Sequence, residues 1–164
     1  MNHGSCLFTA FVLGGCLLFA SNLAAQVEPP VRSGPGNRAV LSDRGSGSFY
    51  DSRGSFSGRS QASGQTTRLY DQRGSYAGRV QSSGDDKSAL YDARGSYAGR
   101  AETSGGSTRY YDSRGSFAGR SNSSGNTTRF YDGKGAFSGR AETSGNTIRY
   151  YDGSGRYVGS KRKK

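Results

Sequence analysis

Two residue types recur where their side chains could do chemistry, and the first is aspartate. It follows tyrosine at Asp51, Asp71, Asp92, Asp112, Asp132 and Asp152. Catalysis by a carboxylate pair needs one distinct setting in which the two pKa values are separated. These aspartates instead occupy equivalent positions, and a turn-forming role explains each of them. We therefore expect no enzymatic activity and no catalytic residue.

The second recurring residue is arginine, whose guanidinium group binds phosphate, sulfate or carboxylate through two parallel hydrogen bonds. The chain has 23 Lys and Arg against 12 Asp and Glu, a net charge of +11. An alternative is that the arginines form a solvated face, partly paired with the aspartates, that keeps the protein soluble. The candidate anion-binding residues are Arg59, Arg79, Arg100, Arg120, Arg140, Arg68, Arg109, Arg129 and Arg149.

Metal and cofactor chemistry has little support in the sequence. His3, Cys6 and Cys16 lie within the first 25 residues, and neither residue type occurs after them. The repeated Asp-x-Arg-Gly sequence places a cation where a calcium-binding loop would supply a second oxygen ligand. We therefore expect no metal site, no disulfide and no cofactor.

The first 25 residues resemble a cleavable secretory signal. Residues 6–20 are apolar and are followed by small residues that end near Ala25. A membrane-anchoring helix is the alternative, but the apolar run is short for one and contains Gly14 and Gly15. Lipidation of Cys16 is a further alternative, although apolar residues follow this cysteine instead of a polar tether. We expect an exported protein, either periplasmic or secreted.

After a Pro-, Gly- and Ser-rich linker at residues 26–48, the chain repeats itself six times over residues 49–159 and ends in a basic tail at residues 160–164. The Tyr-Asp pairs recur at spacings of 20, 21, 20, 20 and 20 residues. Such a period is typical of a repeat architecture in which each unit is one supersecondary element.

Each unit contains two turn signals. The first runs from the aspartate to a glycine three residues later, where aspartate accepts local backbone N–H groups and glycine adopts a left-handed conformation. These glycines are Gly54, Gly74, Gly95, Gly115, Gly135 and Gly155. The second signal is Ser-Gly, as at Ser63-Gly64. Two turns in each unit predict a β-hairpin repeat.

The runs between the turns are about six residues long and rich in Tyr, Phe and Thr, which is typical of short strands. We predict an all-β protein, an antiparallel meander of about twelve short strands from six hairpins of about 20 residues. It could be an open ribbon or solenoid, or it could close radially. The low content of aliphatic residues is typical of disorder, but the fixed phase of the aromatic residues favours an ordered fold.

Strict alternation along the strands predicts which face is buried. If Asp132 pairs with Ala136, then Tyr131 faces Phe137, Phe130 faces Ser138 and Arg129 faces Gly139. An aromatic pair equivalent to Tyr131 and Phe137 recurs in every unit, so this face is the predicted core. The other face, which carries Leu69, Leu90, Tyr110, Phe130 and Tyr150, is predicted to be mixed and wet.

The unit at residues 128–135, Thr-Arg-Phe-Tyr-Asp-Gly-Lys-Gly, resembles the YD repeat of RHS-type and teneurin-type proteins. The resemblance covers residues 49–159, and the chain also resembles small exported bacterial proteins built only of such units. It implies β-hairpin arrays but no known activity. It departs from the pattern after the turn glycine, where only Arg156 conforms.

Charge and compartment together indicate the partners. We expect a non-enzymatic structural or binding module of the cell envelope or exterior that contacts anionic polysaccharide, lipopolysaccharide or a phospholipid surface. Two alternatives remain open. One is nucleic-acid binding, which the basic and aromatic composition also fits. The other is self-association into a polymer through exposed sheet edges.

Overall fold

A computed structural model describes residues 45–164 as twelve β-strands. The predicted signal segment 1–25 and residues 26–44 of the predicted linker lie outside the described residues. The strands are β1 (Gly47–Asp51), β2 (Phe56–Ser63), β3 (Thr66–Asp71), β4 (Tyr76–Ser83), β5 (Lys87–Asp92), β6 (Tyr97–Ser104), β7 (Ser107–Asp112), β8 (Phe117–Ser124), β9 (Thr127–Asp132), β10 (Phe137–Ser144), β11 (Thr147–Asp152) and β12 (Tyr157–Lys163).

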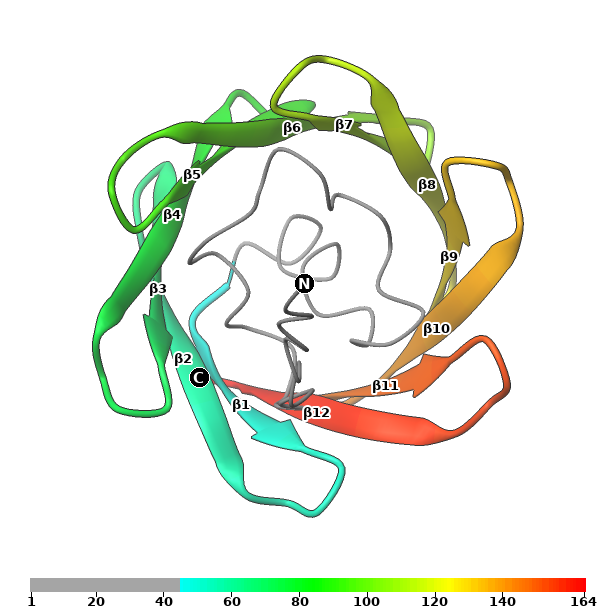
Figure 1. Cartoon of the computed structure of the whole chain (residues 1–164). Coiled ribbons are helices and arrows are strands. Elements are labelled where there is room, and N and C mark those ends of the chain that lie inside the picture. Colours follow the sequence, from blue (N-terminus) through cyan, green and yellow to red (C-terminus); the bar gives the residue numbers. More distant parts are fainter. Residues whose placement is uncertain (1–44) are drawn as a thin grey trace, which may run out of the picture.

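The strands form one antiparallel meander that closes into a barrel (Figure 1). Each strand pairs with its neighbours in the sequence, and β1 pairs with β12 from Gly47↔Lys163 to Asp51↔Gly159. The predicted all-β meander is therefore confirmed, and of the two forms that the sequence left open the structure has the radially closed one. The range 160–164 that we separated as a basic tail overlaps β12, which runs to Lys163.

The aspartate turns lie together at one end of the barrel, which we call the Asp rim. In the first of them Oδ1 of Asp51 accepts the backbone N–H groups of Arg53 and Ser55, both at 2.9 Å. The same two bonds recur at Asp71, Asp92, Asp112, Asp132 and Asp152. Gly54 closes the turn with a φ of +83°, a conformation that glycine adopts without steric cost. Figure 1 shows these turns flaring outward around the barrel.

The strand register differs from the predicted one because each hairpin contains a β-bulge. Tyr131 faces Phe137 as predicted, but Phe130 faces Gly139 and Arg129 faces Arg140. The predicted pairs Phe130–Ser138 and Arg129–Gly139 were therefore wrong. Ser138 on β10 is the extra residue of this bulge and has no Cα partner on β9. The inward and outward alternation of the side chains that follow it on β10 is therefore shifted by one residue.

The predicted core face was also wrong, because the aromatic pairs lie on the outer wall. Phe137 is 44% exposed, whereas Phe130 beside it is 1% exposed. The face predicted to be wet is the interior, and one ring of buried side chains lines it: Phe49, Leu69, Leu90, Tyr110, Phe130 and Tyr150. Small residues on the paired strands, such as Ser121 and Ala141, complete the packing.

Arginine explains why the barrel closes with this face inward. Arg129 lies two residues before Tyr131, so alternation places both side chains on one face. Burying the tyrosine would also bury the arginine, and an unpaired buried charge is too costly. The β-bulge then places Arg140 on the same outer face as Phe137, so that both arginines of the hairpin stay in water.

One charged side chain does enter the interior, at the junction of the two chain ends. Lys161 is 1% exposed and faces Phe49 across the β1–β12 pairing. Its Nζ donates to the carbonyl oxygen of Gly45 at 2.8 Å and lies 5.4 Å from the centre of the Phe49 ring. This contact fastens β12 to the residues that precede β1.

Candidate anion-binding wall

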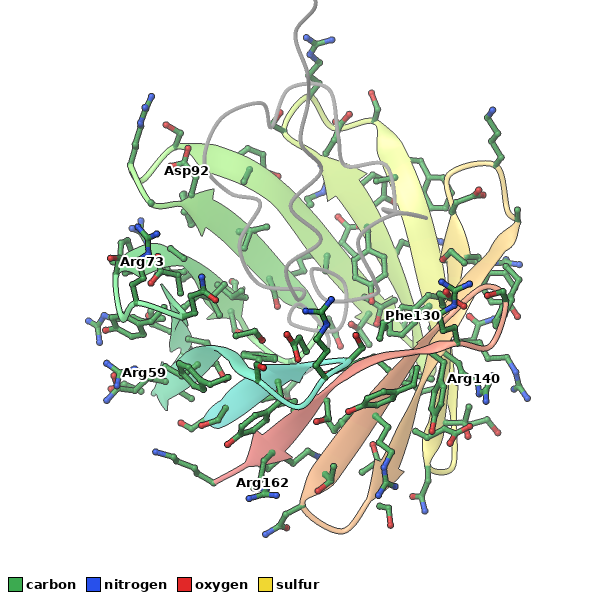
Figure 2. The ribbon with its side chains drawn as sticks, turned by 60° about the horizontal axis from the view of Figure 1, so that its bottom comes forward. Arg59, Arg73, Asp92, Phe130, Arg140 and Arg162 are labelled. Atoms are coloured by element: carbon green, nitrogen blue, oxygen red, sulfur yellow. The ribbon has the colours of Figure 1, made fainter. Side chains whose placement is uncertain are left out.

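The nine candidate arginines form a staggered band round the outer wall, opposite one another within a hairpin and offset by two residues between hairpins, and we call this set the arginine belt. Going round the barrel, Arg59, Arg68 and Arg79 lie on the consecutive strands β2 to β4. A longer run, Arg100, Arg109, Arg120, Arg129, Arg140 and Arg149, lies on the consecutive strands β6 to β11. Figure 2 shows Arg59 and Arg140 projecting away from the barrel on opposite sides of it.

Three positions interrupt the belt. Ala89 on β5 separates the two runs, because it occupies the level of the belt opposite Arg100. Ser160 and Ser48 occupy the same level at the junction of β12 and β1, where they face Arg149 and Arg59. The belt is therefore a short arc and a long arc. At the junction of β12 and β1, Arg162 faces Ser48, and its guanidinium carbon lies 5.8 Å from the centre of the Tyr50 ring.

Arginines of the belt face each other directly across paired strands. Arg68 is opposite Arg79, Arg109 is opposite Arg120, and Arg129 is opposite Arg140. Like charges in directly opposite positions destabilise a sheet by up to about 1 kcal/mol per pair. An anion bound at such a pair would offset part of this repulsion.

Each long-strand arginine of the belt lies over a tyrosine ring of the next hairpin. The guanidinium carbon of Arg100 is 4.1 Å from the centre of the Tyr111 ring, and that of Arg120 is 5.0 Å from the centre of the Tyr131 ring. Arg59, Arg79 and Arg140 lie in the same way over Tyr70, Tyr91 and Tyr151. Cation–π contact of this kind holds each guanidinium group beside the ring of the neighbouring hairpin.

The tyrosines are fixed in turn by edge-on contact with a second aromatic ring. Tyr131 and Phe137 lie 6.1 Å apart with their rings inclined at 72°, and all six hairpins repeat this geometry. Such T-shaped pairs are worth about 0.5–1.5 kcal/mol each. The aromatic residues therefore act as a platform that orders the arginines.

Acidic side chains reach the belt at Glu102 and Glu142. Glu102 accepts a hydrogen bond from Nε of Arg100 at 3.0 Å, and Glu142 accepts one from Nε of Arg140 at 2.7 Å. The bond to Glu102 raises the pKa of Arg100 above its ordinary value, so this group stays charged. The corresponding positions beside Arg59, Arg79 and Arg120 are the neutral Gln61, Gln81 and Asn122.

The Asp rim has one turn with distinct electrostatics. The Ser154 hydroxyl donates to Oδ1 of Asp152 at 2.6 Å, and this bond is the main cause that lowers the pKa of Asp152 below its ordinary value. Two backbone N–H groups and the charge of Arg156 act in the same direction. Oδ1 of Asp152 therefore accepts three hydrogen bonds within its own turn, one more than in the equivalent turns.

We expect Ser154→Ala to raise the pKa of Asp152 towards its ordinary value, as measured by NMR titration of the side-chain carboxyl carbon. A lowered pKa stabilises the fold above the unfolded-state pKa, and this stabilisation is lost as the pH falls through the folded-state value. The variant should therefore be less stable than the parent at neutral pH, with the difference vanishing in acid. Ser154→Thr, which keeps the hydroxyl, should retain the low pKa; an unchanged pKa in Ser154→Ala would contradict this account.

Residues 45–164 contain no group of three or more His, Cys, Asp or Glu side chains that could hold a metal ion. The same range has no helix of the length and apolarity required to cross a membrane.

The fold and its surface together define a closed antiparallel barrel of six β-hairpin repeats whose outer wall carries a belt of arginines supported by aromatic pairs. A scan against protein-family models and a search of curated proteins found no match to this chain.

Proposed function

We propose that this protein is a non-enzymatic, exported repeat protein that binds anionic polymers of the cell envelope or exterior through its arginine belt. The observation that carries the proposal is the set of facing arginine pairs, Arg68–Arg79, Arg109–Arg120 and Arg129–Arg140. A sheet that needed charge only for solubility could alternate the two signs across its strands, and that arrangement would stabilise it. Repeated like-charge pairs favour a partner that supplies the negative charge.

The repeated aspartates support the absence of catalysis in this proposal. Each of them accepts backbone N–H groups of its own turn, so turn formation accounts for its presence. Export rests on the apolar segment at residues 6–20, and the resemblance to small exported proteins of YD-type repeats agrees with it. Periplasm and extracellular space both contain acidic polymers that a basic wall would meet.

Nucleic acid is the second candidate ligand, because arginines beside aromatic rings are also typical of surfaces that bind single strands. Self-association through sheet edges has less support. Within residues 45–164 every strand pairs on both sides, so the closed barrel offers no free edge.

The test is binding of the purified protein to sulfated glycan, carboxylated glycan, lipopolysaccharide and vesicles of anionic phospholipid, with neutral dextran as the control. We expect binding to the sulfated and carboxylated glycans, and no binding to dextran. By analogy with phosphate contacts, six engaged arginines should make the affinity fall roughly a thousandfold between about 50 and 200 mM salt. No binding to any anionic ligand, or binding that salt leaves unchanged, would refute the proposed function.

A further inference from the structure

The long arc of the belt has a direction. Its six arginines, from Arg100 to Arg149, lie on six consecutive strands, so the arc runs across the strands and round the barrel. Neighbouring strands lie about 4.8 Å apart, so the arc spans about 24 Å at the backbone perpendicular to the strands. The path from one arginine to the next is longer, because Arg109, Arg129 and Arg149 are each offset by two residues from the arginine of the preceding strand. Along a single strand, by contrast, the belt has one arginine. A ligand that touches many arginines must follow the circumference.

We infer that the ligand is a flexible, single-chain acidic glycan that wraps round the barrel over β6 to β11, with its sulfate or carboxylate groups between the arginines. Wrapping excludes a stiff ligand. Six of twelve strands make up half of the ring, so a polymer on the whole arc turns through about half a circle within a few nanometres. Duplex DNA, with a persistence length of about 50 nm, does not bend this tightly at acceptable cost.

The tyrosine rings distinguish a glycan from single-stranded nucleic acid. Proteins that bind single strands stack the bases on free aromatic faces. Here the guanidinium groups of Arg100, Arg120 and Arg140 already lie over the tyrosine rings of the long arc, at 4.1 to 5.0 Å from the ring centres. One face of each of these tyrosine rings is therefore occupied, and the rings of the long arc left exposed are Tyr97, Phe117 and Phe137, between 41% and 45%. The arginines are the groups that follow one another strand by strand along the arc, which suits a polymer recognised by its anionic groups.

The gaps in the belt supply substitutions that the fold already accepts. Ser160 and Ser48 occupy positions equivalent to Arg120 and Arg129, so serine is compatible with both. Serine likewise occupies, at Ser154, the turn position equivalent to Arg94 and Arg114 on the Asp rim. Arg120→Ser/Arg129→Ser therefore interrupts the arc, and Arg94→Ser/Arg114→Ser removes the same charge from turns beside it.

The experiment measures the affinity of the full-length protein and these variants for heparin oligosaccharides of graded length and for oligo(dT) of matched charge. We expect affinity to rise with glycan length and to level off once the chain reaches from Arg100 to Arg149. The arc variant should bind about tenfold more weakly, which is about 1.4 kcal/mol, whereas the rim variant should change by less than about twofold. Circular dichroism checks that both variants fold.

A variant that adds an arginine to the belt tests the same path through a gain of affinity. Ala89→Arg joins the two arcs into one that runs from β2 to β11, about 43 Å at the backbone perpendicular to the strands. Oligosaccharides longer than the original arc should then bind more tightly, and shorter ones should bind as before.

This path presupposes the anion binding proposed above, and the outcomes separate the two. Absence of heparin binding in the parent protein would overturn the path, and absence of binding to every anionic ligand named above would overturn the proposed function as well. If the rim variant lost as much affinity for heparin as the arc variant, the path alone would be overturned. An affinity that does not depend on the length of the oligosaccharide would have the same consequence. Tighter binding of oligo(dT) than of heparin would overturn the assignment of a glycan and identify the ligand as single-stranded nucleic acid.

Discussion

Phe130→Ala should reduce the free energy of unfolding by about 3–5 kcal/mol, the cost of removing a fully buried aromatic side chain from a packed interior. Phe130 is 1% exposed and lies in the ring of side chains that lines the barrel, facing Ser121 and Gly139 on its two neighbouring strands. Those small neighbours cannot fill the space that the aromatic ring leaves. Urea denaturation followed by circular dichroism measures the change.

The matched control is Phe137→Ala, which removes the same side chain from the other face of the same hairpin. Phe137 is 44% exposed and loses chiefly its edge-on contact with Tyr131, so a cost of about 1 kcal/mol is expected. The comparison separates the two assignments of the core, since a core of aromatic pairs would give the reverse order. Equal effects of the two substitutions would also contradict the inward orientation of Phe130.

Gly78→Ala should reduce the free energy of unfolding by about 3 kcal/mol, and the thermal midpoint should fall by about 4 °C for each kcal/mol. Gly78 follows the bulged residue of β4 with a φ of +140°. A Cβ there would lie 2.4 Å from the carbonyl oxygen of Tyr91 on β5, which is backbone and cannot move aside. Both the conformation and the contact therefore require glycine.

Gly133→Ser is the control for this prediction. Gly133 has no positive φ, and a Cβ there would come no closer than 3.2 Å to the Phe117 carbonyl oxygen. Ser52 and Ser113 occupy equivalent positions in other repeats, so the change should be within about 0.5 kcal/mol. If Gly78→Ala reduced the free energy of unfolding as little as this control, close packing between hairpins at the bulge would not be the reason for glycine at position 78.

Period and turn chemistry were sufficient to predict the hairpins. The constant distance from each aspartate to its glycine specified the turn, and the recurrence of two turns per unit left an antiparallel meander as the simplest result. Closure could not be predicted in this way, because it depends on twist accumulated over all strands and on β1 pairing with β12.

The face of the sheet was mispredicted because one residue per hairpin is bulged. A single insertion reverses the inward or outward assignment of everything after it on that strand, and alternation gives no sign of the insertion. A signal was nevertheless present in the sequence. Arg129 lies two residues from Tyr131 and shares its face, so burial of the tyrosine would have required burial of a charge.

The candidate site was predictable as a set of residues but not as an arrangement. The repeat identifies which arginines are equivalent, and it requires no structure to do so. Their order round the barrel, the facing pairs and the interruption at Ala89 all follow from the register that the bulge sets. The interior position of Lys161 was missed because its equivalents in other repeats, such as Ser121 and Ala141, are small and uncharged.

Closure of the ring through β1 and β12 restricts how this sequence can change in length. An open array can lose or duplicate a unit at its end, since each unit needs only its neighbour. Here a seventh hairpin would widen the ring and a five-hairpin version would narrow it, so either change would alter how the inward side chains pack. Duplication and deletion of the repeat are thus constrained by geometry, whereas exchange of one hairpin for another preserves the circumference.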